Sequence, residues 1–174
     1  MTPAELLAQK IRDVPDFPEP GVVFKDITPL LQDPKSLELA CSLLAEPYRD
    51  RPIDVVVGIE SRGFIFGPPV ACLLGAGFVP ARKLGKLPWE TVSQRYELEY
   101  GRSEIEMHRD AVAPGQQVLL VDDLIATGGT ASATVKLIRS MGGHLVGGSF
   151  LIELSFLEGR KVLDGVEVEV ILSY

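Results

Sequence analysis

Short runs of aliphatic residues alternate along this chain with longer segments in which apolar residues recur every three or four positions. The runs at 54–59 and 118–121 are almost continuously aliphatic, which predicts strands buried on both faces of a sheet. The segments from residue 34 to about 47 and from 130 to 141 have the period of a helix. This order of elements predicts an α/β fold, in which helices cover both faces of a twisted, mostly parallel sheet.

The remaining elements follow from the same patterns and from the residues that interrupt them. A capping box formed by Thr2 and Glu5, with Pro3 at the first helical position, predicts a short N-terminal helix. We expect a further helix between residues 63 and 75, and further strands at 77–81, 104–107, 145–154 and 166–170. Because residues 166–170 alternate strictly between apolar and polar, this last strand is expected near a sheet edge.

Two segments have little periodicity. The prolines and Gly21 of residues 16–30 argue against a helix, so we expect an ordered hood over about residues 1–33, with Phe24 at its tip. Residues 82–101 are interrupted by several breakers and predict a flexible loop. Loops of this length are usually functional in a compact domain. Because no linker composition or repeat divides the chain, residues 1–174 are expected to form a single domain.

Composition and charge narrow the class of protein. Of 174 residues, 46% are hydrophobic and 24% are charged, which is ordinary for a globular domain. The formal net charge of −7 argues against a general binder of nucleic acid or anionic membranes, because such a protein needs a basic surface. Any anionic ligand must therefore be held by local groups. We find no signal peptide and no apolar stretch near the roughly 18 residues that span a bilayer.

The cysteines and histidines give no sign of a metal centre. Cys41 and Cys72 lie in apolar helical patterns without a basic neighbour, so both are expected to be buried thiols. His108 and His144 have no ligand-like spacing to each other or to the cysteines. These features indicate a reduced, cytoplasmic, soluble protein with no dedicated metal site.

The most informative segment is 118–130. Its buried strand brings Asp122 and Asp123 to the carboxyl edge of the sheet, where α/β proteins bind ligands. A turn of small residues and the start of a helix follow, and their N–H groups can bind a phosphate. Two adjacent acids suit two ribose hydroxyls, so a ribose 5-phosphate fits both halves. Alternatively, the acids merely cap a turn.

This segment resembles the motif with which type I phosphoribosyltransferases bind phosphoribosyl pyrophosphate (PRPP): an apolar strand, two acids, two variable residues, then Ala/Ser-Thr-Gly-Gly-Thr. It is neither a Walker A loop nor a Rossmann fingerprint. The resemblance implies the fold of that family, with a hood and a flexible loop. It also implies that Asp122 and Asp123 hold the ribose. The residues implied to hold the 5-phosphate are Ala126, Thr127, Gly128, Gly129 and Thr130.

The segment 16–30 resembles the adenine-binding hood of adenine phosphoribosyltransferases. The resemblance implies that the backbone around Val23 and Lys25 reads the edge of the base and that Phe24 stacks on its ring. Stacking accepts any base, so specificity must come from hydrogen bonds. By itself, Phe24 is more typical of a core residue. Lys25 stands where many relatives have Arg, which leaves its role open.

The segment 58–64 ends a buried strand in a Gly-flanked turn that carries an arginine. A guanidinium fork suits phosphate oxygens, although Arg62 could equally pair with Glu60 or another surface acid. In the resembled family this turn is the pyrophosphate loop, with Arg62 as its main charge and Glu60 and Ser61 shaping the backbone. The residues implied to bind pyrophosphate are Glu60, Ser61, Arg62, Gly63, Arg82, Lys83 and Lys86.

The segment 82–101 begins with three cations and ends with acids and tyrosines. Such a loop could close over a pyrophosphate and exclude water. Its end, residues 98–101, matches the family signature of the acid/base carboxylate. The match implies that Glu99 acts on the N7 side of the purine and that Tyr100 positions the substrates, with Arg62 as the third catalytic group. The alternative is that Glu97 and Glu99 are the solvated face of a strand.

Together the resemblances imply transfer of the phosphoribosyl group from PRPP to adenine, giving AMP and pyrophosphate, as in purine salvage. Mg²⁺ would be held mainly by the diphosphate, ribose hydroxyls and water, with Asp122 and Asp123 contacting it through water. A homodimer is expected, with residues 82–86 completing the neighbour's site. The alternatives are a transferase for a 6-oxopurine, a PRPP-sensing regulator that binds nucleic acid, and a nucleotide-binding module without chemistry.

Overall fold

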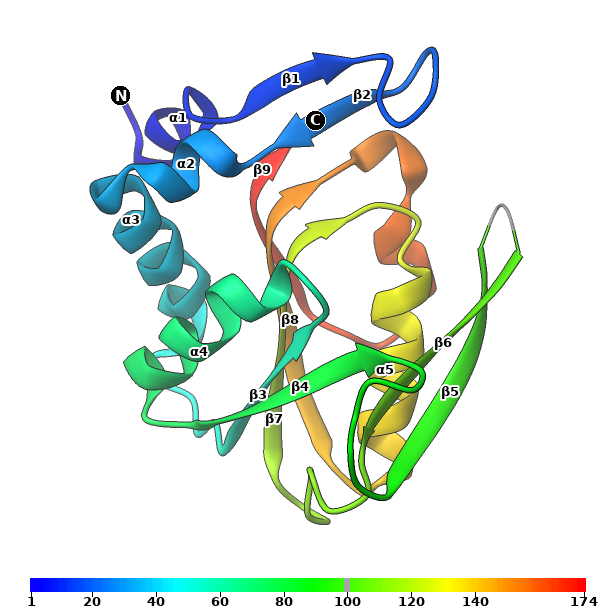
Figure 1. Cartoon of the computed structure of the whole chain (residues 1–174). Coiled ribbons are helices and arrows are strands. Elements are labelled where there is room, and N and C mark those ends of the chain that lie inside the picture. The colour runs from blue at the N-terminus through cyan, green and yellow to red at the C-terminus, as the bar shows by residue number, and fades with distance from the viewer. Residues whose placement is uncertain (99–100) are drawn as a thin grey trace. The chain divides into compact units, whose positions relative to one another are not determined.

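The computed structural model describes residues 1–98 and 101–174 and divides the chain into two compact units, residues 1–43 and 44–174. Figure 1 shows the elements of both units. The elements that begin in the first unit are α1 (Pro3–Ala8), β1 (Arg12–Pro15), β2 (Val23–Asp26), α2 (Thr28–Gln32) and α3 (Pro34–Ala45). The predicted capping box is confirmed at α1, where Glu5 N donates to Thr2 Oγ1 at 3.2 Å and Thr2 N donates to Glu5 Oε2 at 2.7 Å.

The first unit contains a two-stranded antiparallel sheet, in which Val14 of β1 lies opposite Phe24 of β2. Phe17 packs edge-to-face on Phe24, with ring centroids 5.3 Å apart. The hood is therefore ordered, as predicted, but Phe24 lies within a strand and not at the tip. Helix α2 is also a correction, because it begins at Thr28 inside the segment for which no helix was expected.

Asp26 ends the second hood strand and fixes the start of α2. Its carboxylate accepts from Thr28 N at 2.9 Å and from Arg12 Nη2 at 2.6 Å. Hydrogen bonds from Thr28, followed by those from Arg12, lower the pKa of Asp26 to about 2. This carboxyl group therefore stays ionised at any physiological pH.

The second unit is built on a seven-stranded sheet in the order β5-β6-β4-β3-β7-β8-β9. The pairs from β4 to β9 are parallel, whereas β6 runs antiparallel to both β4 and β5. Its strands are β3 (Val55–Ile59), β4 (Gly77–Lys83), β5 (Thr91–Leu98), β6 (Gly101–His108), β7 (Gln117–Ile125), β8 (His144–Glu153) and β9 (Val168–Ser173). The mostly parallel sheet and the edge position of the last strand are confirmed.

Two helices cover this sheet, α4 (Gly63–Leu74) and α5 (Gly129–Ser140). The connection β3-α4-β4 steps along the sheet in one direction and β7-α5-β8 steps in the other. Right-handed crossovers in opposite directions put their helices on opposite faces, as Figure 1 shows. The described residues also form three short 3₁₀ helices, η1 (Glu46–Tyr48), η2 (Ser155–Leu157) and η3 (Gly159–Val162). Every residue of β3 is buried, which explains its unbroken aliphatic sequence.

The predicted irregular loop over 82–101 is wrong for most of its length. Strand β4 continues to Lys83, and β5 begins at Thr91 and pairs with β6. Along β5, Val92 and Tyr96 pack against the core of the unit while the residues between them include exposed ones. The polar Gln94 stands between these two apolar positions on the same face, which hides the period-2 pattern of a strand.

The prediction for Cys72 is also wrong. Cys41 is buried, as expected, but Cys72 lies exposed on α4. Burial raises the pKa of the Cys41 thiol to about 11. None of the helices in the described part of the chain is long and apolar enough to span a membrane.

Candidate active site

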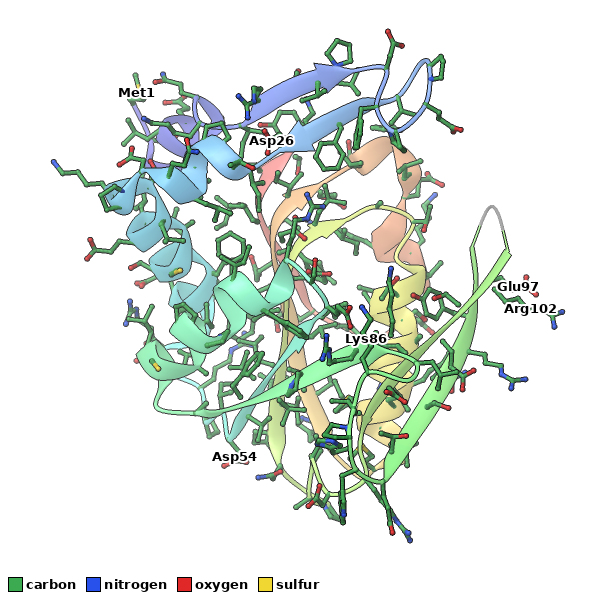
Figure 2. The ribbon with its side chains drawn as sticks, viewed as in Figure 1. Met1, Asp26, Asp54, Lys86, Glu97 and Arg102 are labelled. Carbon is green, nitrogen blue, oxygen red and sulfur yellow. The ribbon has the colours of Figure 1, made fainter. Side chains whose placement is uncertain are left out.

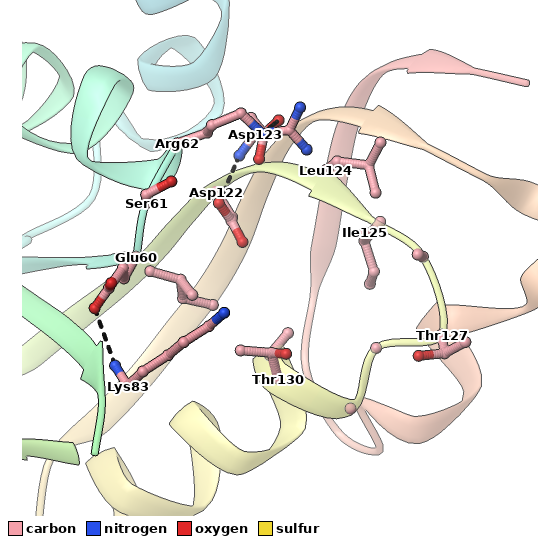
Figure 3. A pocket seen from close by; sticks show the side chains of 15 residues that line it. Glu60, Ser61, Arg62, Lys83, Asp122, Asp123, Leu124, Ile125, Thr127 and Thr130 are labelled. Atoms are coloured by element: carbon pink, nitrogen blue, oxygen red, sulfur yellow. Dashed lines mark hydrogen bonds and ion pairs between the residues drawn. The ribbon is translucent and has the colours of Figure 1, made fainter. Parts of the chain in front are cut away.

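Strands β3 and β7 are parallel neighbours, so the segments that follow them meet at one edge of the sheet. A cavity of about 380 Å³ lies at this edge (Figure 3). Its lining residues are Ile59, Glu60, Ser61, Arg62, Lys83, Asp122, Asp123, Leu124, Ile125, Ala126, Thr127, Gly128, Gly129, Thr130 and Ala131. The structure thus brings together two segments that the sequence analysis singled out separately, one for pyrophosphate and one for ribose 5-phosphate.

Residues 126–130, the phosphate loop, connect β7 to α5. Gly128 has φ +79° and is the N-cap of the helix, and Gly129 is its first residue. A side chain at Gly128 would be strained at this φ and would overlap Gly159 O and Val162 from η3. The loop therefore requires glycine both for its turn and for its packing. The N-terminal end of α5 lies at the cavity. The N–H groups of the first helical turn have no partner within the helix and can bind an anion there.

The back of the phosphate loop rests on the segment after β8, a support that the sequence analysis did not identify. A methyl group on Gly159 would overlap Ala126 O, so the two backbones are in close contact. Leu154 N donates to Ile125 O at 3.0 Å. Glu153 Oε1 accepts from Arg160 Nε at 2.7 Å and is mostly buried. These contacts between residues distant in the sequence reveal the support, and no spacing in the sequence indicates it.

The acid pair lies at the centre of the cavity wall. Asp123 is 4% exposed, and its Oδ2 is 2.9 Å from Arg62 Nε. Asp122 Oδ1 accepts from Asp123 N at 2.9 Å. Burial raises the pKa of both carboxyl groups; the charge of Asp123 adds to the rise at Asp122, whereas Arg62 opposes it at Asp123. Keeping both acids ionised is thus costly in free energy.

Arg62 pairs with Asp123 and not with Glu60. Glu60 instead joins the cations of β4 and of the turn after it: its carboxylate accepts from Arg82 Nε at 3.2 Å, from Lys83 N at 3.0 Å and from Lys86 Nζ. Burial works to raise the pKa of Glu60, but these partners outweigh it and lower the pKa. The alternative that Arg62 pairs with Glu60 or another surface acid is therefore wrong, because its partner is the buried Asp123.

The remaining residues of the pyrophosphate group take different places. Ser61 lines the cavity, and the Glu60–Ser61 peptide bond is cis. Gly63 lies behind the acid pair, where an added carbon would be 2.9 Å from Asp122 Oδ1. Lys83 lines the cavity, and in Figure 3 its side chain points toward Asp122 and Thr130. Arg82 and Lys86 are not among the lining residues and contact Glu60 at its outer side.

The predicted site includes two further groups of residues. Val23, Phe24 and Lys25 belong to the first unit, where Lys25 Nζ is 2.7 Å from Asp13 Oδ1. Glu99 and Tyr100 lie outside the described residues, between strands β5 and β6. The predicted roles of these five residues stay predictions.

Comparison with known proteins adds a family to this geometry. Residues 26–162 match the phosphoribosyl transferase domain family. The chain is 59% identical over 163 residues to the adenine phosphoribosyltransferase of Thermobifida fusca, with 94% of this chain and 93% of that protein covered. The crystal structure of the Rhodothermus marinus adenine phosphoribosyltransferase has a TM-score of 0.94 at 56% identity, covering 99% of this chain and 98% of that one. The Saccharomyces cerevisiae enzyme, complexed with adenine and an imino-altritol bisphosphate, has a TM-score of 0.93 at 40% identity, covering 98% of each chain.

Proposed function

The chain belongs to the adenine phosphoribosyltransferases, and we propose that it carries out their reaction at the cavity between β3 and β7. It transfers the 5-phosphoribosyl group from PRPP to adenine and gives AMP and pyrophosphate, a step of purine salvage. The alternatives of a 6-oxopurine transferase, a PRPP-sensing regulator and a module without chemistry are not supported, because relatives at 50–59% identity over most of the chain are adenine phosphoribosyltransferases.

One observation supports the location of the site. The phosphate loop and the acid pair line the same cavity as residues 60–62, although about 60 positions separate residues 60–62 from the acid pair in the sequence. A ribose 5-phosphate with a diphosphate at its other end needs an anion site, hydroxyl acceptors and a cationic group in that order. The cavity has groups of these three kinds.

In the proposed arrangement the phosphate loop binds the 5-phosphate through its N–H groups and the hydroxyls of Thr127 and Thr130. Asp122 and Asp123 accept hydrogen bonds from the ribose hydroxyls, and their charge favours an oxocarbenium-like transition state. Arg62 and Lys83 bind the diphosphate. Their positive charge stabilises the electron pair that leaves with pyrophosphate as its bond to ribose C1 breaks.

Adenine supplies the electron pair of the new bond from N9, and the ring proton, which N7 carries when N9 is the nucleophile, passes to the Glu99 carboxylate. Glu99 acts as the acid/base group on the N7 side, and Tyr100 positions the substrates. Phe24 stacks on the base, and the backbone around Val23 and Lys25 reads its edge. Adenine in the yeast relative supports a purine site in this family, and these residue roles are our proposal.

Mg²⁺ is proposed as the partner of PRPP in this site. The described residues contain no cluster of three or more side chains arranged to hold a metal ion. Asp122 and Asp123 nevertheless line the cavity, and carboxylates suit a hard cation that is carried mainly by a diphosphate. When bound, the ion neutralises charge on the diphosphate. A homodimer and a cytoplasmic location are also part of the proposal, and light scattering tests the first.

The experiment is pyrophosphate release from PRPP and Mg²⁺ with adenine, hypoxanthine, guanine or xanthine, for wild type, Glu99→Gln and Glu97→Gln. Glu97, an exposed residue of β5 that lies two positions before Glu99 in the sequence, is the control. We expect turnover with adenine and a fall in kcat on the order of 100-fold or more for Glu99→Gln, the usual contribution of a general acid/base. Glu97→Gln should behave as wild type.

Each other outcome contradicts a separate part of the proposal. If Glu99→Gln turns over adenine at the wild-type rate, Glu99 is not the acid/base group, but the assignment of the reaction stands. Comparable turnover with hypoxanthine or guanine would show that the hood does not select adenine. Equal losses in both variants would indicate damage to the hairpin and not chemistry at residue 99.

A further inference from the structure

Strand β6 buries a carboxylate that the mechanism above does not use. Three consecutive residues of this strand, Ile105, Glu106 and Met107, are only 1%, 3% and 0% exposed, so the strand is buried on both faces here. A buried charge requires partners. Glu106 therefore needs partners from outside β6, because no described neighbour in its strand forms an ion pair with it.

The partners of Glu106 are three consecutive backbone amides. Gly85 N, Lys86 N and Leu87 N each donate to Glu106 Oε1 at 3.1 Å. Gly85 has φ +84°, which turns the chain so that these N–H groups converge on one point. The carboxylate thus occupies an anion-binding turn made by the protein itself, residues 84–90, which we call the β4–β5 turn.

The β4–β5 turn carries a cation to the edge of the active-site cavity. Lys86 pairs with Glu60, and Arg82, which lies opposite Glu106 in the β4–β6 pairing, bonds both Glu60 and Lys86 O, the latter at 3.3 Å. Lys86 is labelled in Figure 2. The position of the turn determines where Lys86 lies and therefore where it holds the Glu60 carboxylate. Glu60 lines the cavity next to Ser61 and Arg62, so the turn acts on this side of the cavity.

We propose that Glu106 is a positioning residue for the pyrophosphate end of the substrate. Its carboxylate holds the β4–β5 turn in the conformation that sets Lys86 against Glu60, and it thereby fixes the Glu60–Arg62 side of the cavity. This inference rests on the proposed pyrophosphate site. It makes the turn specific to one substrate group: pyrophosphate and PRPP depend on Glu106, whereas AMP, which lacks the diphosphate, does not.

The test compares wild type with Glu106→Gln, Glu106→Ala and Glu90→Gln. Glutamine keeps an acceptor oxygen without the charge, and alanine removes both. Glu90 lies in the same turn, but its partner Arg109, at 3.3 Å, is 70% exposed and Glu90 itself is 63% exposed, so Glu90→Gln is the matched control. Calorimetry gives Kd for magnesium pyrophosphate and for AMP, steady-state rates give KM for PRPP and adenine, and hydrogen exchange follows amides 85–87.

We expect Glu106→Gln to raise Kd for pyrophosphate and KM for PRPP by about tenfold, the loss when charge-assisted bonds become neutral ones, and Glu106→Ala to raise them further. Kd for AMP and KM for adenine should stay within about twofold, the usual scatter of a remote neutral change. Exchange at amides 85–87 should accelerate in both Glu106 variants. Glu90→Gln should match wild type in every measurement.

Two results would overturn the inference. If AMP and pyrophosphate weaken equally, or only the melting temperature falls, Glu106 is a general stabilising residue. If exchange accelerates while pyrophosphate binding stays unchanged, the turn is anchored as described but does not serve this substrate group. Failure of the proposed site is separate: Arg62→Ala would then leave pyrophosphate binding intact, whatever the Glu106 variants do. Should Glu106→Ala not fold, Glu106→Gln still distinguishes these cases.

Discussion

A methyl group added at Gly159 tests whether the segment after β8 holds the phosphate loop in place. Residue 159 lies more than 25 positions from the loop in sequence, and no substrate role is proposed for it. An added carbon would overlap Ala126 O and would lie 3.0 Å from Ile125 Cγ1 and 3.1 Å from the Ala126 carbonyl carbon. Because these are mainly backbone atoms, no side chain can rotate away to make room.

The size of the effect follows from the movement that the loop must make. Restoring an ordinary separation of about 3.5 Å requires a shift of about 1 Å between η3 and the loop. A misplacement of about 1 Å in groups that position a substrate can cost on the order of 100-fold in rate. We therefore expect Gly159→Ala to lower kcat/KM for PRPP by that factor and to weaken AMP binding similarly.

The assay is initial-rate pyrophosphate release, with calorimetry for AMP and for magnesium pyrophosphate. Pyrophosphate binding should be unchanged in Gly159→Ala, because the Arg62 end of the cavity lies away from the overlap. Gly77→Ala is the control, since its added carbon meets nothing closer than Asp54 O at 3.7 Å. A Gly159→Ala protein with wild-type affinity for AMP would refute the argument that this contact sets the loop.

The remaining predictions concern the acid pair and its cation. Asp122→Asn should raise Tm of the ligand-free protein at pH 7.5 by about 2–4 °C, equal to about 1 kcal/mol in a domain of this size, because burial and the charge of Asp123 raise the pKa of Asp122. Since that raised pKa makes ionisation costly, the gain should shrink as the pH falls toward the ordinary Asp range, and a gain that is constant with pH in thermal scans would contradict this cause. Arg62→Lys should lower kcat/KM for PRPP by about tenfold or more and leave KM for adenine unchanged. The reason is that an ammonium cannot replace the guanidinium fork between Asp123 and a diphosphate. Initial rates at varied concentrations of PRPP and adenine measure both constants.

The parts of the fold and site that sequence predicted well are those in which neighbouring residues act together. The strand, acid pair and glycines of the phosphate loop are contiguous, so the buried strand, the turn and the start of the helix are all visible in one run of residues. The buried strand β3 is visible for the same reason, because a strand covered on both faces is aliphatic throughout.

The features that sequence missed depend on contacts between distant residues. Strand β5 was taken for a loop because Gln94 occupies a position on the same face as Val92 and Tyr96, and only pairing with β6 reveals it. The burial of Glu106 is not visible in the sequence, since nothing local indicates that three amides of another segment bind it. Such contacts are fixed by tertiary packing, which local propensity does not encode.

Charge balance explains how a chain with a net charge of −7 can bind a polyanion. Three cations at the cavity or next to it have acidic partners: Arg62 pairs with Asp123, and Arg82 and Lys86 pair with Glu60. The side chains of these two acids are only 5% and 7% exposed, so they hold long cationic side chains in place before substrate arrives, which reduces the entropy lost on binding. A count of charges along the chain excludes a broad basic surface. It cannot show this arrangement, because each pair joins residues that are 22 to 61 positions apart.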